Sequence, residues 1–429
     1  MSDSAGLPTT GDRSVDLGAV DPAGSRQLGR RSAVCFRGDA VVAGLADGSV
    51  VALDADTLDE RWRDEGVRDG GGASRNDDAP GSAVTLLPFA DGVLVGERGP
   101  DGAVRLLDAD TGAERWRYRT ADDVGEPAKR TRFFLPFVVD AVADDRRAYV
   151  AARRYERGTD GGRYFESVVY AFEADGTVAW RYETGASPIA LDVRDGRVAA
   201  GYNRCPGTDA DGLVVLDAET GAVTRRWDPP GDGDRRVGDV SLIDGGVGVT
   251  SHADYRGYLL DTGDDGPDSE DGSVHWAVDL GRPVDRGDET VYAYPNHVHA
   301  TGDGVVFVTG NTYPEDGRET DARHPTEHAA VGVAPDGAVR WESSVGGFVH
   351  EIAAEGDRLA VPAAQHFRDR NSDAHALHEF DVVDGRIATR SVAGVATAAA
   401  IGDGRVAVVE EPVAYHDGDG VRGAYRIHR

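Results

Sequence analysis

Cysteine and long apolar runs are scarce in this chain, and each shortage excludes a class of protein. Only Cys35 and Cys205 occur in 429 residues, so neither a disulfide framework nor a Cys-x-x-Cys metal site is available. The apolar runs are much shorter than the ~20 residues that span a bilayer. The opening segment lacks a signal-peptide core, and the pair Arg30 and Arg31 precedes a strand-like segment rather than the apolar stretch of an export signal. We therefore expect a cytoplasmic protein without membrane insertion.

Basic residues are also few, and Lys129 is the only lysine. The chain carries 76 acidic against 46 basic residues, which gives a formal charge of -30. Such a surface stays soluble in molar salt, where the Debye length falls to roughly 3 Å, and it indicates a halophilic, archaeal type of protein. Because no basic stripe offsets the acidic surface, we expect no binding of nucleic acid.

What the chain does contain is an internal repeat, seen best in residues 104–117, VRLLDADTGAERWR. An alternating strand is followed by a turn with Gly112 free to take a positive φ, and Trp116 comes four residues later. The same glycine-to-tryptophan step joins Gly176 to Trp180, Gly272 to Trp276, and Gly337 to Trp341, while looser copies place Trp62 after Leu58, Trp227 after Gly221, and Thr389 after Gly385. All six tryptophans fall at this one place of the repeat.

A second turn and alternating strand precede each copy, as in Asp91-Gly92 before VLVG. The pattern predicts eight units of four antiparallel strands, A to D, and therefore an all-β, eight-bladed β-propeller in one domain over 14–429. The last unit lacks a fourth strand, so 14–20 is predicted to complete it and to close the ring, with 1–13 disordered. The predicted blades cover 33–69, 82–120, 131–184, 187–230, 237–280, 290–345, 347–391 and 392–429.

Two of these copies carry a family resemblance: Ala52-x-Asp54-x-x-Thr57 ending at Trp62, and Asp108-x-x-Thr111-Gly112 ending at Trp116. They resemble the tryptophan-docking repeats of the PQQ-type, quinoprotein-like propellers, a superfamily that includes quinoprotein alcohol dehydrogenases and BamB-like scaffold proteins. The resemblance implies that the tryptophans pack one blade against the next. It does not extend to the dehydrogenases' adjacent-cysteine disulfide, because no two cysteines are adjacent here.

Function is expected where the long connections lie. In a four-stranded antiparallel blade the A–B and C–D turns share one face of the ring, and the B–C and D–A connections share the other. The second face gathers Arg, His, Tyr and Asn rather than acids, which predicts a site for a polar or anionic ligand or a protein partner. The candidates are Arg132, Arg153, Arg154, Tyr155, Asn203, Arg204, His252, His297, Asn311, His350 and His366. Hydrogen bonds that anchor loops around a water-filled channel are the alternative interpretation.

A metal site is weakly indicated. His297 and His299 are two residues apart on one predicted strand, and His350 lies on the corresponding strand of the next blade. No carboxylate or cysteine completes a ligand pattern, so no metal and no other cofactor is predicted. The favoured function is a monomeric, non-catalytic binding or scaffold module. The alternative is a quinone- or metal-dependent oxidoreductase with an atypical site, which would use pyrroloquinoline quinone or a divalent metal.

Overall fold

A computed structural model describes residues 13–24, 30–66, 81–207, 211–261, 274–317, 319–366, 368–369, 374–415 and 420–429. These residues form β-strands almost throughout. The one helix among them is the four-residue α1 (Ala121–Val124). No helix in the described part of the chain is long and apolar enough to cross a membrane.

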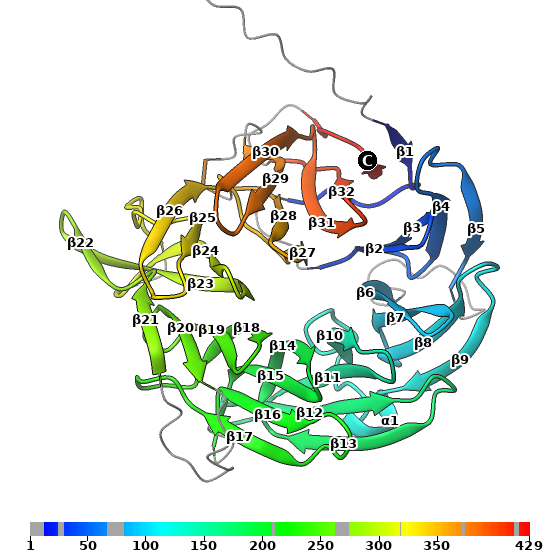
Figure 1. Ribbon diagram of the computed structural model, residues 1–429, viewed down its shortest axis with the longest axis horizontal. Coiled ribbons are helices and arrows are strands. Elements are labelled where there is room, and N and C mark those ends of the chain that lie inside the picture. Colours follow the sequence, from blue (N-terminus) through cyan, green and yellow to red (C-terminus); the bar gives the residue numbers. More distant parts are fainter. Residues whose placement is uncertain are drawn as a thin grey trace, which may run out of the picture.

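The strands form four-stranded antiparallel units, which we number in chain order (Figure 1). Unit 1 contains β2 (Ala33–Arg37), β3 (Ala40–Gly44), β4 (Val50–Asp54) and β5 (Glu60–Asp64). Unit 2 contains β6 (Ser82–Phe89), β7 (Gly92–Arg98), β8 (Ala103–Asp108) and β9 (Glu114–Arg119). Unit 3 contains β10 (Phe137–Ala143), β11 (Ala148–Arg157), β12 (Arg163–Phe172) and β13 (Val178–Thr184). Unit 4 contains β14 (Ser187–Arg194), β15 (Arg197–Arg204), β16 (Leu213–Asp217) and β17 (Val223–Trp227).

The second half of the chain continues the pattern. Unit 5 contains β18 (Val237–Ile243), β19 (Gly246–Ser251), β20 (Arg256–Asp261) and β21 (Val274–Asp279). Unit 6 contains β22 (Val284–Arg286), β23 (Glu289–Thr301), β24 (Gly304–Pro314), β25 (Ala329–Val333) and β26 (Val339–Ser344). Unit 7 contains β27 (Ala353–Glu355), β28 (Arg358–Ala363), β29 (Ala376–Asp381) and β30 (Gly385–Ser391). Unit 8 contains β31 (Val395–Gly402), β32 (Arg405–Glu411), β33 (Arg426–His428) and β1 (Ser14–Asp16).

The units stand around a central axis, with the first strand of each nearest the centre except in unit 6, where β23 lies inward and β22 lies at the outside (Figure 1). The prediction of an all-β fold built from four-stranded antiparallel sheets, as in a β-propeller, is confirmed. Units 2 and 3 share one eight-stranded sheet, because β7 and β10 meet at the pair Arg98 and Phe137. Unit 6 has a fifth strand, β22, so its sheet begins at Val284 rather than at the predicted limit of 290.

The leading strand pairs with the end of the chain. β1 runs antiparallel to β33, with Ser14 opposite His428, in the sheet order β1-β33-β32-β31. Arg13, which was predicted to be disordered, exchanges two backbone hydrogen bonds with Arg429, of 3.3 and 2.9 Å. The rest of the segment predicted to be disordered, 1–12, lies outside the described residues.

Tryptophans join units 1 to 7, each to the next. The indole Nε1 of Trp62 donates to the backbone oxygen of Ala109 in the third turn of unit 2 (2.8 Å), and the ring lies over Gly112 of that turn. A Cβ on Gly112, whose φ is +72°, would stand 2.5 Å from the indole, so only glycine fits. Trp116, Trp180, Trp276 and Trp341 lie in the same way over Gly176, Gly221, Gly337 and Gly385.

Two copies of the repeat differ from this arrangement. Trp227 packs edge-to-face on Tyr258, with ring centroids 5.1 Å apart, while the third turn of unit 5, with Gly272, lies outside the described residues. Thr389, which replaces the indole in unit 7, lies with its hydroxyl 3.1 Å from Nδ1 of His378.

Candidate functional site

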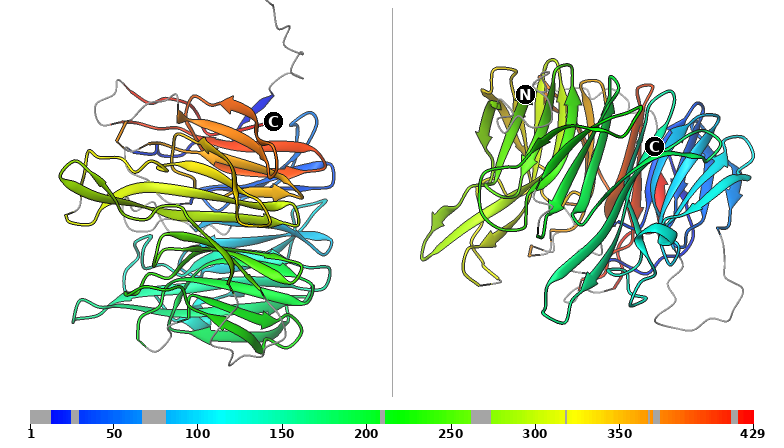
Figure 2. Two further views of the ribbon diagram at one scale, coloured as in Figure 1. Left: turned by 60° about the vertical axis from the view of Figure 1, so that its left-hand side comes forward. Right: turned by 90° about the horizontal axis from the view of Figure 1, so that it is seen from below.

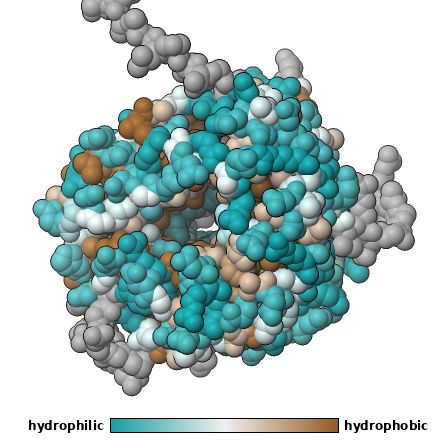
Figure 3. All heavy atoms as spheres, turned by 45° about the vertical axis from the view of Figure 1, so that its right-hand side comes forward, coloured by the Kyte–Doolittle hydropathy of each residue, from teal (hydrophilic) through white to brown (hydrophobic). Residues whose placement is uncertain are grey.

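The connections between the second and third strands of a unit, and those between units, lie on one side of the molecule, which we call the loop face. The hairpin of β11 and β12 extends toward this side, and so do the open ends of the long strands β23 and β24 (Figure 2). A cavity of about 760 Å³ lies at the axis, surrounded by the first strands of units 3, 4, 5 and 7 and by β23 of unit 6. A hollow at the centre of the molecule is visible in Figure 3.

Carboxylates line this axial cavity, and they link consecutive inner strands. Asp140 accepts the amide of Ala141 (2.9 Å) with one oxygen and that of Leu191, in unit 4, with the other (2.8 Å). Asp192 accepts amides of its own and the next inner strand in the same way, and so does Asp239. Burial raises the pKa of Asp140 to about 7 and that of Asp192 to about 6. Each oxygen of these three carboxyl groups therefore accepts a backbone amide, so the groups hold neighbouring inner strands together in the cavity wall.

The histidines of the cavity are also committed to hydrogen bonds. His252 has Nε2 3.0 Å from the backbone oxygen of Pro295 and Nδ1 2.8 Å from the side-chain nitrogen of Asn203. Nε2 of His297 lies 3.0 Å from the oxygen of Val349, and Nε2 of His299 lies 2.7 Å from that of Gly356. An imidazole nitrogen that faces a carbonyl must carry the proton, so it has no lone pair for a metal.

Burial sets the charge of these imidazoles. It lowers the pKa of His252 to about 3, with Arg235 adding to the effect. It lowers the pKa of His350 to about 3 as well, with Arg30 and His297 contributing next. His350 lies edge-to-face on Phe348, with ring centroids 5.3 Å apart. Both imidazoles are neutral near pH 7.

Several other residues that were predicted to bind a ligand instead contact other parts of the chain. Arg154 donates to the backbone oxygen of Val124 in α1 and pairs with Glu156. Arg204 pairs with Asp234 at 3.0 Å. Tyr155 packs between Phe134 and Phe165, with centroids 5.1 and 5.5 Å away. For these positions the arrangement agrees with loop-anchoring contacts.

Arg153 is placed differently. Its guanidinium carbon lies 5.7 Å from the ring centroid of Phe137, over which Arg98 also stacks at 3.8 Å. Arg132 lies beside this pair and stacks on Phe133 at 4.9 Å. Phe137 and Arg30 line the axial cavity. Arginines thus gather where units 2 and 3 meet, on the loop face of a strongly acidic protein.

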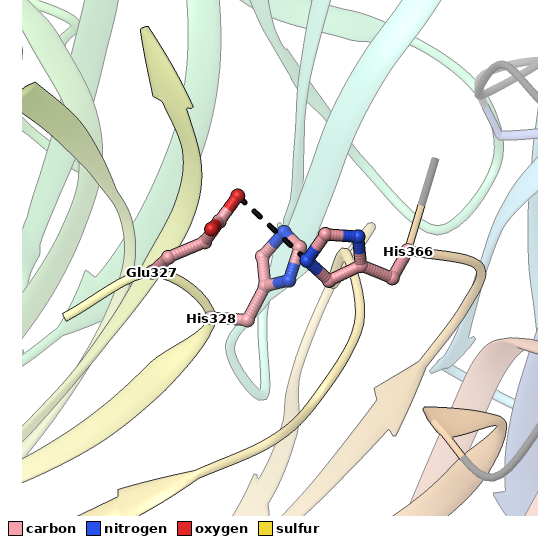
Figure 4. A group of neighbouring side chains, drawn as sticks. All are labelled: Glu327, His328 and His366. Atoms are coloured by element: carbon pink, nitrogen blue, oxygen red, sulfur yellow. Dashed lines mark ion pairs between the residues drawn. The ribbon is translucent and has the colours of Figure 1, made fainter. Parts of the chain in front are cut away.

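A second cluster joins the loops of units 6 and 7. Glu327, His328 and His366 each offer one ligand atom within 4.8 Å of the others (Figure 4). Asn311 accepts from His328 (Oδ1 to Nε2, 2.8 Å), and Glu327 pairs with Arg368 at 3.2 Å. Two of the predicted site residues, Asn311 and His366, are brought together here.

The donor set of this cluster fits a metal only in part. Glu327 Oε2 is buried without a hydrogen-bond donor among the described residues, as a ligand oxygen would be. Nδ1 of His366, however, accepts the amides of Arg368 and Asp369 at 3.3 and 3.1 Å, so Nε2 carries the proton of the neutral ring. Ligation through Nε2 requires these two amides to turn away.

Sequence reasoning missed Arg98, Glu327 and His328. A signal for the last two was present, because the segment His324-Pro-Thr-Glu327-His328 has the H-x-x-E-H spacing of some zinc sites. His324 itself bonds to Thr326 (2.8 Å) and to the backbone of Arg282 (2.9 Å), so His366 of the next unit takes the third place. No sequence signal marks Arg98, which follows an ordinary apolar strand.

The comparisons with known proteins agree with this fold. Residues 46–244 match the family model described as outer membrane protein assembly factor BamB. No curated protein matches the chain.

Solved structures of similar shape have low sequence identity. A quinohemoprotein alcohol dehydrogenase from Pseudomonas putida HK5 is 12% identical with a TM-score of 0.58, over 97% of this chain and 75% of that chain. A quinohemoprotein alcohol dehydrogenase from Comamonas testosteroni is 11% identical with a TM-score of 0.53, over 97% and 76%. BamB from Moraxella catarrhalis is 16% identical over 80% and 82%, with a TM-score of 0.47. At these identities the likeness to the dehydrogenases shows the fold alone.

Proposed function

From the premise that the chain is a PQQ-like repeat β-propeller, we propose that it is a non-catalytic binding module whose loop face holds a polar or anionic ligand or a protein partner. In this proposal the units close into an eight-bladed ring, with β1 completing the last blade. A cytoplasmic location and a monomeric state stay predictions from the sequence.

The observation that carries this proposal is the commitment of the cavity's acids and imidazoles to the backbone. Asp140, Asp192 and Asp239 hold neighbouring inner strands with both oxygens. His252 has both ring nitrogens in hydrogen bonds. A general base needs a lone pair directed at the substrate, whereas these groups form a rigid, polar wall. A rigid wall of this kind suits recognition.

Aromatic side chains also line the axial cavity and can contact a ligand there. Tyr294 and Tyr313 line the cavity with ring centroids 5.4 Å apart, and Arg235 stacks on Tyr294 at 4.7 Å. Flat rings next to a guanidinium suit the apolar side of a ligand that carries an anionic group.

The test separates binding from catalysis. Protein purified in molar KCl is denatured, and the released small molecules are identified by mass spectrometry. We expect a polar or anionic molecule near one per chain. Its amount should fall in Arg235→Gln and Tyr313→Ala and be kept in the matched variant Arg115→Gln, whose arginine pairs with Asp108 on the opposite face. Dye reduction with alcohols or aldose sugars, after incubation with pyrroloquinoline quinone and calcium, contradicts the proposal.

A second candidate function, a metal-dependent activity, is favoured by the cluster of Glu327, His328 and His366. Its test is metal analysis after dialysis against Zn²⁺. One zinc per chain, lost in His328→Ala and kept in His299→Ala, supports this candidate, and no retained zinc removes it.

A further inference from the structure

One rung of the sheet shared by units 2 and 3 places four side chains in line. Phe137 of β10 lies opposite Arg98 of β7 on one side and opposite Arg153 of β11 on the other. Ser167 of β12 comes next, because it pairs with Arg153. Directly opposed residues on neighbouring strands project from the same face of a sheet. Two guanidinium groups therefore flank the ring of Phe137, and the hydroxyl of Ser167 lies beyond Arg153 on the same rung.

The two guanidinium groups have no carboxylate partner among the described residues. The charged groups that act on Arg98 are the arginines Arg153, Arg30 and Arg132, and burial together with these like charges lowers its pKa to about 9. Burial lowers the pKa of Arg153 to about 10. Positive charge is thus concentrated and uncompensated at this rung.

Other buried or half-buried arginines of the chain do have carboxylate partners. Arg105, which is fully buried between units 1 and 2, lies 2.6 Å from Asp64 and 2.7 Å from Glu97. Arg30, at the edge of the rung, pairs with Glu351 at 2.8 Å. In a chain rich in acids, an unpaired pair of half-buried guanidiniums indicates that the counter-ion comes from outside.

Unused donors lie at the same place. Nε of Arg98 and Oγ of Ser167 are both buried without a hydrogen-bond partner among the described residues. Ser167 is 3% exposed, so bulk water does not satisfy its hydroxyl. Buried polar groups are nearly always hydrogen-bonded in folded proteins, so an acceptor is missing here.

We propose that Arg98, Arg153 and Ser167 bind a phosphate group, either free or carried on an ester. A phosphate monoester bears a charge of about −1.5 to −2 at pH 7, which matches the two unpaired guanidiniums. Its tetrahedral oxygens accept from guanidinium and hydroxyl donors together. Phe137 and Arg30 line the axial cavity, so the remainder of an ester has room there. This assignment rests on the proposed function, because it names the anion that the loop face holds.

The experiment is calorimetric titration of the full chain in molar KCl with inorganic phosphate and, separately, with phosphoserine. Arg98→Gln, Arg153→Gln and Ser167→Ala are compared with wild type. Arg115→Gln is the control, because Arg115 is exposed next to the third turn of unit 2, on the opposite face, and pairs with Asp108. We expect at least tenfold weaker binding in both arginine variants, severalfold weaker binding in Ser167→Ala, and no change in the control. Tighter binding of phosphoserine than of inorganic phosphate identifies an ester as the ligand, and the reverse identifies free phosphate.

Stability gives an independent readout. Removing an unpaired buried charge relieves repulsion, so Arg98→Gln and Arg153→Gln should melt at the same temperature as wild type or higher when phosphate is absent. Phosphate should raise the melting temperature of wild type but not of these variants. Phosphate binding that is equal in all proteins overturns the assignment.

Failure of this assignment and failure of the proposed function give different results. If phosphate does not bind but a phosphorus-free polar molecule is released from the purified protein, the ligand class is wrong and the binding module stands. If neither phosphate nor a released molecule is found, both are wrong.

Discussion

Tryptophans join units 1 to 7, each to the next, whereas unit 8 is joined to unit 7 and to unit 1 without one. At the tryptophan joints an indole lies over a turn glycine and donates to a carbonyl of the same turn, as Trp62 does with Gly112 and Ala109. At the closing joint the turn glycine is replaced by Leu58, at φ 63°, and the leucine side chain is buried in one cluster with Leu17 and Ile427.

The closing joint also depends on polar contacts between the two ends of the chain. Arg31 pairs with Glu411, whose side chain is 3% exposed, and Ser32 lies 3.0 Å from Glu411 and 2.8 Å from the hydroxyl of Tyr425. The comparison teaches that the repeat supplies the joints between units 1 to 7 from a local motif. The joint without a motif is built from residues that are distant in sequence.

The largest effect is expected from removing β1. A chain that lacks 1–17 loses the β1 and β33 pairing and the buried Leu17, and it exposes a strand edge. We expect a loss of about 3–5 kcal/mol in the free energy of unfolding and concentration-dependent association. Urea unfolding and sedimentation velocity measure these effects. The control lacks only 1–12 and should behave as wild type, and equal behaviour of both truncations contradicts a structural role for β1.

Trp62→Ala tests a tryptophan joint. Trp62 is 8% exposed, so its removal leaves a cavity between units 1 and 2, and we expect a loss of about 3–5 kcal/mol. Trp62→Phe keeps a ring but loses the hydrogen bond to Ala109, and should cost less. Chemical unfolding followed by circular dichroism gives both values. A cost below 1 kcal/mol for the alanine variant would show that the indole does not hold the joint.

Exchanging the turn residues sharpens the comparison. Gly112→Leu places a side chain at φ +72° against the indole of Trp62, and should cost about 3 kcal/mol. Leu58→Gly removes a buried leucine but also relieves a positive φ, so the two effects partly offset and about 1 kcal/mol is expected. Thermal unfolding of the two variants side by side measures this. Equal costs would mean that the two joints are built alike.

A small effect that depends on pH is expected at the inner edge of a tryptophan joint, where Asp140 links units 3 and 4. Burial raises its pKa from 3.8 to about 7, so the folded protein binds more protons than the unfolded chain between these values. Stability therefore falls as pH rises from about 4 to about 7, by about 1–2 kcal/mol after allowance for water in the cavity.

The variant Asp140→Asn isolates this contribution. The stability of this variant should change less with pH than that of wild type between about pH 4 and 7. Urea midpoints measure this at constant molar KCl, because the salt screens the repulsion among the other acidic groups. Asp303→Asn, in an exposed turn, is the control. Parallel pH profiles for wild type and Asp140→Asn would show that this carboxyl does not titrate as described.

The sequence predicted the strands and the joints better than the site. The spacing of Gly112 and Trp116 is a local pattern, so it predicted a turn and a strand correctly, and its recurrence predicted the stacking of units. The short strand β22 and the merging of β7 with β10 carried no such pattern. Among the candidate residues, Arg154 and Arg204 proved to anchor loops, because Arg154 pairs with Glu156 and Arg204 pairs with Asp234.

The sequence by itself determined the repeating four-stranded unit and the place of its indoles, since alternation along a strand and turn chemistry act over a few residues. Only the tertiary structure decided which polar groups meet. Arg98 and Arg153 come together through the register of Phe137, and Glu327 meets His366 through the packing of units 6 and 7. The physical reason is that such contacts depend on strand register and on the angle between units. A shift of one residue in register would send Arg98 or Arg153 to the other face of the sheet.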